Sequence, residues 1–301
     1  MGWLRNLLGG EAGDNPATHP PLPEGTGDFL PGGTSRGFHA SAVARGVAPE
    51  TGAIIFRSGA GASLHSQAEA EEQARTLAEQ HLANALAGAA SQRDTYAYAV
   101  NRAIEPVVSD LTFPGGNAGR LTINSYGALI INARAAFFAD VDTRTEDTAP
   151  PDPAADEAAA ARLRDVIARE PDLSFRVYRT HNGWRYLCTS RLFDPAAPET
   201  QQLLEDLGVD RRYQVLCRVQ RCFRARVTPK PWRIGKRFSE VHPTQTVSRR
   251  HLERYLRRGA GFASAAFVDA AGRGATASPE IAAVVSCHDD WCAALSGRPL
   301  A

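Results

Sequence analysis

Two aspartates at the end of an apolar run are the residues of this sequence best suited to chemistry. The apolar stretch that begins at Ala135 ends in Asp140 and Asp142. Side chains two residues apart on a strand point to the same side. Carboxylates held that close repel each other unless a cation lies between them, and an oxygen-binding ion such as Mg²⁺ or Mn²⁺ suits such a position. The alternative is a strand that simply runs out into an acidic loop.

A strongly basic segment runs from Arg221 to Arg258. It contains twelve Lys and Arg residues against two Glu, a local net charge of +10 in a chain whose overall net charge is +1. Its first residues alternate between apolar and polar side chains, which predicts a strand with Arg224 and Arg226 on one face. Together with Lys230 these guanidiniums form a predicted phosphate-binding group, and the neighbouring Trp232 offers a ring on which a base stacks. The alternative is a basic surface covered by water.

The helices and strands expected around these residues indicate an α+β fold. We expect a mixed or antiparallel sheet built from hairpins with flanking helices, in a single domain over residues 49–301. Residues 1–48 are rich in Gly, Pro and small polar residues and are expected to form a disordered tail. Apolar residues at helical spacing predict helices at 66–89, 94–111, 155–169 and 248–258, and two shorter ones around Leu204 and Leu216.

The predicted strands place the two candidate motifs on hairpins. Residues 121–132, bent near Gly127, are expected to pair with the strand at 137–142, and residues 143–154 to form a flexible linker or surface excursion. Asn182-Gly183, between the β-rich arms of 173–189, is the strongest short-range hairpin signal in the chain.

Composition limits the class of protein. With 43% hydrophobic and 22% charged residues the chain has the composition of a globular protein. Its apolar runs fall short of the roughly 20 residues that a membrane helix needs, so no membrane partner is expected. Five cysteines, an odd number, favour a reducing compartment, and we expect a cytoplasmic protein. Two cysteine pairs, 217/222 and 287/292, allow a zinc site, but their spacing favours small buried side chains. No sequence feature specifies an oligomeric state.

The order of the motifs resembles the archaeo-eukaryotic primase-polymerase superfamily. In that superfamily an apolar strand ends in Asp-x-Asp, a later hairpin brings Ser or Thr, Gly and His to the nucleotide phosphates, and a third acidic residue follows. Phe-Phe-Ala-Asp140-Val-Asp142 resembles the first element, and Arg179-Thr180-His181-Asn-Gly183-Trp-Arg185 resembles the second. The sequence departs from the family where Arg185 replaces the usual His after the Gly, with His181 displaced before it.

The resemblance covers about residues 120–290 and implies roles for individual residues. Asp140, Asp142 and Asp289 would be the catalytic metal ligands, the third chosen over Asp194 and Asp290. The implied phosphate- and nucleotide-binding residues are Arg179, Thr180, His181, Arg185, Arg224, Arg226 and Lys230. The stretch from residue 222 to 233 also resembles a group of uncharacterised bacterial proteins, which implies no activity.

Two functions of different classes follow. The first is a nucleotidyl- or phosphoryl-transfer enzyme that depends on Mg²⁺ or Mn²⁺ and acts on nucleotides or nucleic acid, with the ion neutralising charge on the phosphate. The second is a non-catalytic nucleic-acid or polyanion binder that uses the same arginines without a metal. A third option is a structural protein that binds partners through residues 1–48.

Overall fold

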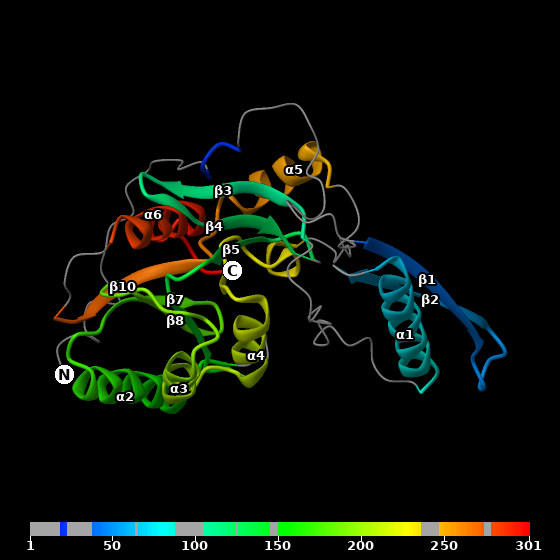
Figure 1. Ribbon diagram of the computed structural model, residues 1–301, viewed down its shortest axis with the longest axis horizontal. Coiled ribbons are helices and arrows are strands. Elements are labelled where there is room, and N and C mark those ends of the chain that lie inside the picture. Colours follow the sequence, from blue (N-terminus) through cyan, green and yellow to red (C-terminus); the bar gives the residue numbers. More distant parts are fainter. Residues whose placement is uncertain are drawn as a thin grey trace.

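The computed structural model describes residues 19–22, 38–63, 66–87, 105–124, 126–144, 150–235, 247–273 and 278–301 (Figure 1). Within these ranges the chain forms six α-helices and ten strands, and the strands lie in three antiparallel sheets. The predicted α+β class is therefore confirmed. None of the helices in the described ranges is both long and apolar enough to cross a membrane.

A two-stranded sheet and one helix form the first unit of the chain. Strands β1 (Phe38–Val47) and β2 (Ile54–Ser63) pair along their whole length, and helix α1 (Gln67–Leu86) packs on both. The Ser66 hydroxyl caps α1 by accepting a hydrogen bond from the Glu69 backbone N–H at 3.1 Å, as its Ser-x-x-Glu pattern predicts. The tail predicted for residues 1–48 is too long, because residues 38–47 form β1 and pair with β2.

A four-stranded sheet carries the Asp-x-Asp strand. Its order is β10-β7-β8-β6, where β6 is Phe138–Asp142, β7 is Ser174–Thr180, β8 is Gly183–Cys188 and β10 is Ala265–Gly272. The hairpin predicted at Asn182-Gly183 is confirmed, since β7 and β8 pair across it. Helix α2 (Pro153–Arg169) follows β6 and buries Leu163 and Val166, whereas α3 (Pro198–Asp206) and α4 (Arg211–Gln220) follow β8.

A second four-stranded sheet corrects three of the predictions. Its order is β3-β4-β5-β9, where β3 is Val107–Phe113, β4 is Gly116–Ile123, β5 is Leu129–Ala133 and β9 is Phe223–Arg226. The end of the helix predicted at 94–111 is strand β3, whose β-branched residues suit a sheet; residues 94–104 lie outside the described ranges. The strand predicted at 121–132 is two strands joined by a tight turn at Gly127, where φ is 86°.

The expected hairpin between 121–132 and 137–142 is also wrong. Strand β5 pairs with β4 and β9, whereas β6 pairs with β8 in the other sheet. Of the excursion predicted at 143–154, residues 145–149 lie outside the described ranges. The Thr143 hydroxyl at its start donates to the Asp156 carboxylate of α2 at 2.7 Å, and its last residues, from Pro153, already belong to that helix.

The two four-stranded sheets meet at one core, and the remaining elements lie around their junction. The ring of Phe137 lies 5.1 Å from that of Phe223 and 6.3 Å from that of Phe175, so it contacts residues from both sheets. Helix α6 (Pro279–Cys292) packs on β3 and β4 of one sheet and on β10 of the other (Figure 1). The short 3₁₀ helix η2 (Pro231–Ile234) follows β9, and α5 (Arg249–Gly259) packs beside it.

Candidate functional site

Asp140 forms a two-point ion pair with Arg185. The register of β6 and β8 places the two residues directly opposite each other. Arg185 donates from Nε to Oδ1 at 2.6 Å and from Nη2 to Oδ2 at 2.7 Å, so both carboxylate oxygens bind the same guanidinium. The Arg185 side chain is 2% exposed and that of Asp140 is 34% exposed. Burial opposes ionisation of the guanidinium, but the adjacent Asp140 carboxylate raises the pKa of Arg185 above its ordinary value.

Arg185 also joins the two four-stranded sheets. Its third donor, Nη1, donates to the Arg226 carbonyl oxygen on β9 at 2.8 Å. Nearby, the Tyr213 hydroxyl lies 3.1 Å from the Phe138 carbonyl oxygen on β6 and 2.9 Å from the Arg224 carbonyl oxygen on β9. Side chains therefore satisfy backbone groups where the edge strands β6 and β9 approach without pairing. Asp140 supplies the negative charge that allows a guanidinium to be buried at this junction.

Asp289 is held by three side chains in the adjoining part of the core. Arg176 Nη2 donates to Oδ2 at 2.6 Å, and the Tyr178 hydroxyl donates to Oδ1 at 2.7 Å. His288 Nδ1 lies 3.1 Å from Oδ1, while its Nε2 lies 3.2 Å from Arg185 Nη1. A neutral imidazole that donates from Nδ1 and accepts at Nε2 satisfies both contacts. Burial opposes ionisation of Asp289, but hydrogen bonds from His288 and Tyr178 and the charge of Arg176 lower its pKa.

Asp142 differs from the other two carboxylates because it lies exposed at the end of β6. Loss of hydration, followed by the charge of Asp140, raises its pKa, and the positive charges of Lys230, Arg226 and Arg233 oppose that rise. The acidic strand end and part of the basic segment therefore lie within electrostatic range of each other. Of the three predicted metal ligands, Asp142 alone has no ion pair within the described residues.

The three aspartates do not fit a Mg²⁺ or Mn²⁺ site. Both oxygens of Asp140 and both oxygens of Asp289 already accept hydrogen bonds from protein donors, and a guanidinium occupies the side of Asp140 that faces the protein. A divalent ion needs several oxygen ligands around one point. Within the described part of the chain, no three or more His, Cys, Asp or Glu side chains group closely enough to hold a metal ion. In this structure Asp140 and Asp289 form ion pairs with Arg185 and Arg176, and metal ligation by the two aspartates stays a prediction.

Several predicted phosphate-binding residues likewise have structural partners. Arg179 forms an ion pair with Asp156 of α2 at 2.6 Å and lies over the Trp184 ring. Arg224 forms a buried ion pair with Glu105 at 2.5 Å, and each side chain is 8% exposed. The strand face that carries Arg224 is thus directed at a carboxylate in the core. Arg179, Arg185 and Arg224 each have a carboxylate partner in this structure, and their assignment to phosphate stays a prediction.

The two polar residues of the predicted nucleotide hairpin stabilise its turn. The Thr180 hydroxyl accepts a hydrogen bond from the Gly183 backbone N–H at 3.2 Å. His181 Nδ1 lies 2.8 Å from the Asn182 side-chain oxygen. Gly183 has no room for a side chain, since a Cβ atom there would lie 2.0 Å from the Val141 carbonyl oxygen on β6. These contacts account for the His-Asn-Gly sequence as turn chemistry.

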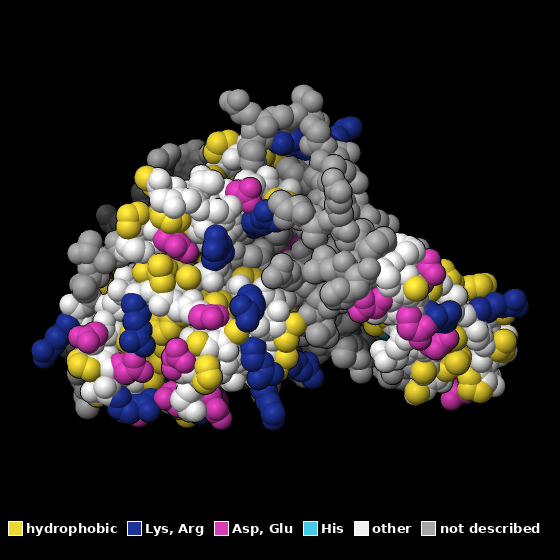
Figure 2. Space-filling view, in the orientation of Figure 1, with side chains coloured by type: hydrophobic (Ala, Val, Ile, Leu, Met, Phe, Trp, Pro, Cys, Tyr) yellow, Lys and Arg dark blue, Asp and Glu magenta, His cyan; other side chains and the backbone are white. Residues whose placement is uncertain are grey.

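Basic residues of α5 and of the adjoining η2 are here called the α5–η2 surface. It consists of the exposed α5 residues Arg250, Arg254, Arg257 and Arg258 and of the partly buried Lys230 and Arg233, which precede and belong to η2. The Tyr255 hydroxyl fixes α5 against the chain before η2, by donating to the Pro229 carbonyl oxygen and by a 3.2 Å contact with the Thr228 hydroxyl. Figure 2 shows Lys and Arg side chains at the surface over α5.

Aromatic rings lie within this surface. Lys230 Nζ is 5.2 Å from the centre of the Trp232 ring, a cation–π contact. The Tyr126 ring meets Trp232 edge-on at 5.4 Å. Trp232 thus contacts Lys230 and Tyr126, and stacking of a base on its ring stays a prediction.

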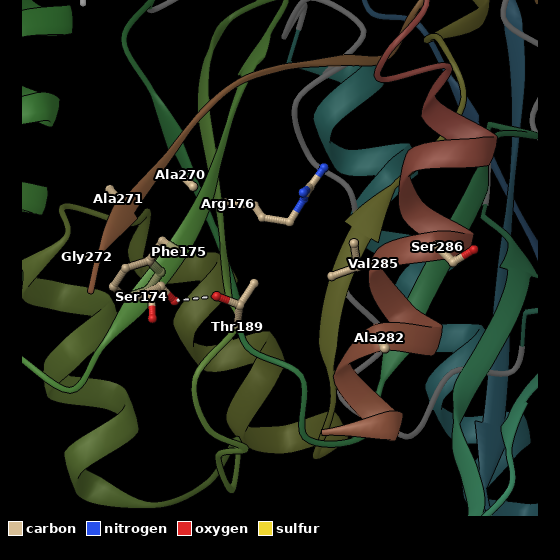
Figure 3. A pocket seen from close by; sticks show the side chains of 10 residues that line it. All are labelled: Ser174, Phe175, Arg176, Thr189, Ala270, Ala271, Gly272, Ala282, Val285 and Ser286. Carbon is tan, nitrogen blue, oxygen red and sulfur yellow. Dashed lines mark hydrogen bonds between the residues drawn. The ribbon is translucent and has the colours of Figure 1, made fainter. Parts of the chain in front are cut away.

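A groove of about 450 Å³ opens between α6 and the strands β7 and β10 (Figure 3). Its walls are mostly small residues, among them Ala270, Ala271 and Ala282. Arg176 extends from β7 into the groove toward α6, as Figure 3 shows. Its charge is balanced by Asp289, and its guanidinium lies 4.1 Å from the Phe267 ring centre. The groove is therefore largely apolar with no net charge.

The cysteines of the two candidate zinc pairs do not form a metal site in the described residues. Cys217 and Cys292 are buried, Cys222 and Cys287 are partly buried, and all are reduced. Burial raises the pKa of Cys217 to about 12 and that of Cys222 to about 11, so both remain thiols at neutral pH.

Sequence reasoning missed the acidic and aromatic partners that complete these ion pairs. Glu105 lies 119 positions before Arg224, and Asp156 is on a helix outside both motifs. The one available signal was the i, i+2 spacing of Arg176 and Tyr178 on a strand, which puts both on one face. Compared with known proteins, the chain matches no family model, no curated protein and no solved structure.

Proposed function

We propose that this protein binds single-stranded nucleic acid through the α5–η2 surface, without a metal and without catalysis. The observation that carries the proposal is the row of exposed arginines on α5, a helix held beside η2 by its buried face. Glu253, half-buried, is the one acidic residue of α5, against five arginines. A concentration of positive charge of this kind attracts phosphates and releases their counterions.

The arginines of α5 have a spacing that suits a phosphate backbone. Arg250, Arg254, Arg257 and Arg258 lie opposite the buried face formed by Leu252, Tyr255 and Leu256. At about 1.5 Å per residue they extend over roughly 12 Å, which corresponds to about three or four nucleotides at about 3.4 Å each. Trp232 beside Lys230 adds an aromatic ring of the kind on which bases stack.

We propose binding and not nucleotidyl transfer because two of the three predicted metal-ligating aspartates already form ion pairs. A metal-dependent transfer enzyme needs its carboxylates for metal ions, whereas Asp140 and Asp289 here form ion pairs with Arg185 and Arg176. The arginines of α5 instead face outward. Metal-dependent transfer to nucleotides stays a prediction from the motif order.

Fluorescence anisotropy with a labelled 20-nucleotide single strand tests the proposal. The titration is done in EDTA at several salt concentrations between 50 and 200 mM. We expect binding that weakens as salt rises, and we expect Arg254→Ala and Arg257→Ala each to reduce the slope of log K against log salt by about 0.7. Arg211→Ala, which removes an exposed arginine from α4, is the matched control and should leave the slope unchanged.

Two results would reject the proposal. One is absence of binding by the wild type at 50 mM salt, or binding that the α5 variants do not weaken relative to Arg211→Ala. The other is binding that appears only with Mn²⁺ and is lost in Asp142→Asn, which would return the metal-dependent enzyme to first place.

A further inference from the structure

Large rings fill the space between the β7–β10 sheet and α6 at one end of the helix. Tyr178 of β7 and Phe267 of β10 are cross-strand partners, so their side chains lie on the same face of the sheet. Their rings meet edge-on at 5.8 Å, and the Tyr178 ring lies 4.5 Å from that of His288 on α6. Sheet and helix are therefore packed together at this end.

Small residues occupy the same sheet face toward the other end of α6 (Figure 3). The next cross-strand pairs are Arg176 with Ala270 and Ser174 with Gly272. The φ angle of Gly272 is 95°, and a Cβ atom there would lie 2.3 Å from the Leu173 carbonyl oxygen, so no larger residue fits. The change from rings to small side chains along this face opens the groove of about 450 Å³.

One face of α6 forms the opposite wall of the groove. Ala282, Val285 and Ser286 have the i, i+3, i+4 spacing of a helix face, and Asp289 continues that face by one turn. The wall is therefore mostly apolar, and it becomes acidic at the end where Asp289 pairs with Arg176.

Arg176 brings unused hydrogen-bond donors into the groove. Its Nε donates to the Tyr178 hydroxyl oxygen at 2.7 Å and its Nη2 to Asp289 Oδ2 at 2.6 Å. Its Nη1 makes no hydrogen bond within the described residues, and one side of the guanidinium lies against the Phe267 ring. Because each Nη nitrogen of a guanidinium carries two N–H groups, Arg176 can still donate to an acceptor in the groove.

The Ser174 hydroxyl is a second polar group without a partner at this site. The residue lines the groove and is 4% exposed, and its Oγ makes no hydrogen bond in the part of the chain that the structure describes. Buried hydroxyls usually have a hydrogen-bond partner, because leaving one unpaired costs free energy. Thr189 Oγ1, which donates to the Ser174 carbonyl oxygen at 3.2 Å, also lines the groove and can still accept a hydrogen bond.

We propose that this groove binds an uncharged small molecule with an apolar body and one carbonyl oxygen, which accepts a hydrogen bond from Arg176 Nη1. The alanine, valine and glycine walls suit an apolar body. Asp289 already balances the charge of Arg176, so a carboxylate ligand would place an uncompensated negative charge beside Asp289. At about 30 Å³ for each small group, the groove holds about ten to fifteen non-hydrogen atoms.

Titration of the full chain with 4-phenylbutanamide, followed by ligand-observed NMR, tests the proposal. This probe has an aromatic ring, a short chain and one amide carbonyl. We expect saturable binding with a dissociation constant on the order of 0.1–1 mM, as suits a ligand of about twelve non-hydrogen atoms. The probe 4-phenylbutanoate has the same shape with a charged carboxylate, and it should bind at least about fivefold more weakly at pH 7 because Asp289 repels it.

Two variants test the site itself. Ala282→Phe fills the groove and leaves the polar groups in place, and it should weaken amide binding at least about tenfold. Ala158→Phe adds the same ring at an exposed position of α2 and is the matched control, with unchanged binding expected. Arg176→Met removes the donors and should weaken amide binding about tenfold. Far-UV circular dichroism verifies that each variant keeps its helices, and Ala282→Phe decides if loss of the Asp289 partner unfolds Arg176→Met.

Absence of saturable amide binding by the wild type up to about 5 mM would overturn the proposal. Equal dissociation constants for Ala282→Phe and Ala158→Phe would also overturn it, because the probe would then bind outside the groove. A third contrary result is tighter binding of the carboxylate than of the amide, since the groove would then select anions.

Discussion

The substitution Asp140→Asn distinguishes the two roles proposed for Asp140, metal ligand and ion-pair partner of Arg185. The substitution keeps the shape of the side chain and removes its charge, leaving the Arg185 guanidinium, 2% exposed, without its counterion. Breaking a buried ion pair in this way costs about 3–5 kcal/mol. Asp140 is itself one-third exposed, and Arg185 keeps its bond to the Arg226 carbonyl. We therefore expect the free energy of unfolding to fall by about 2–4 kcal/mol.

Asp142→Asn is the matched control, two residues along the same strand. Its carboxylate is exposed and has a raised pKa, so the charge is unfavourable in the folded state at neutral pH. Removing that charge should change the free energy of unfolding by less than about 1 kcal/mol, toward greater stability. A double-mutant cycle with Arg185→Met measures the coupling directly, and we expect more than about 1 kcal/mol between Asp140 and Arg185.

Urea denaturation at pH 7, with and without 1 mM MnCl₂, provides the measurement. An ion held by both aspartates would stabilise the wild type by about 2.7 kcal/mol if its dissociation constant were about 10 µM, and both Asn variants would abolish that gain. The ion-pair assignment predicts no stabilisation by Mn²⁺ and unequal effects of the two substitutions. Equal effects on stability, or stabilisation by Mn²⁺ that needs both aspartates, would refute the reasoning.

Two further predictions concern contacts that hold the elements together. Burial opposes the ionisation of Asp156, but hydrogen bonds from Arg179 and Thr143 lower its pKa. The ionised side chain therefore contributes its full stabilisation above the unfolded-state pKa of about 3.9, and this contribution is lost as pH falls through the lower folded-state pKa. Urea denaturation between pH 2 and 6 should show Asp156→Asn less stable than wild type at pH 6 and closer to it at pH 2; a constant difference would contradict this assignment. Tyr213→Phe removes the hydroxyl that contacts both the Phe138 and the Arg224 carbonyl oxygens. We expect it to lower the free energy of unfolding by about 1–3 kcal/mol at pH 7. An unchanged free energy of unfolding would show that this hydroxyl does not link the sheets.

Local signals in the sequence predicted local structure well. The Asn182-Gly183 turn, the Ser66 cap and the alternation around Phe223 each depend on neighbours within a few residues, and each prediction is confirmed. The predictions that failed concern which strands pair with each other. Nothing within residues 121–142 distinguishes a hairpin between two adjacent segments from strands that enter different sheets.

For the candidate site too, local features were predicted from the sequence and long-range contacts were not. The position of Asp140 and Asp142 at the end of an apolar strand was predicted correctly. Their availability was not, because it depends on Arg185, which lies 45 positions away along the chain and opposite Asp140 in space. For Arg224 the deciding residue is Glu105, 119 positions distant. Long-range partners of this kind carry no periodic signal that one sequence can reveal.

By itself, the sequence determined which residues alternate, where helices begin, and that positive charge gathers between Arg221 and Arg258. These properties follow from backbone geometry and side-chain chemistry over short distances. Only the tertiary structure decided which charged side chains form ion pairs inside the protein and which stay on its surface. Burying a guanidinium requires a carboxylate beside it, and folding supplied those carboxylates from distant strands and helices. The arginines of α5 remain on the surface because that helix buries its leucines and Tyr255 instead.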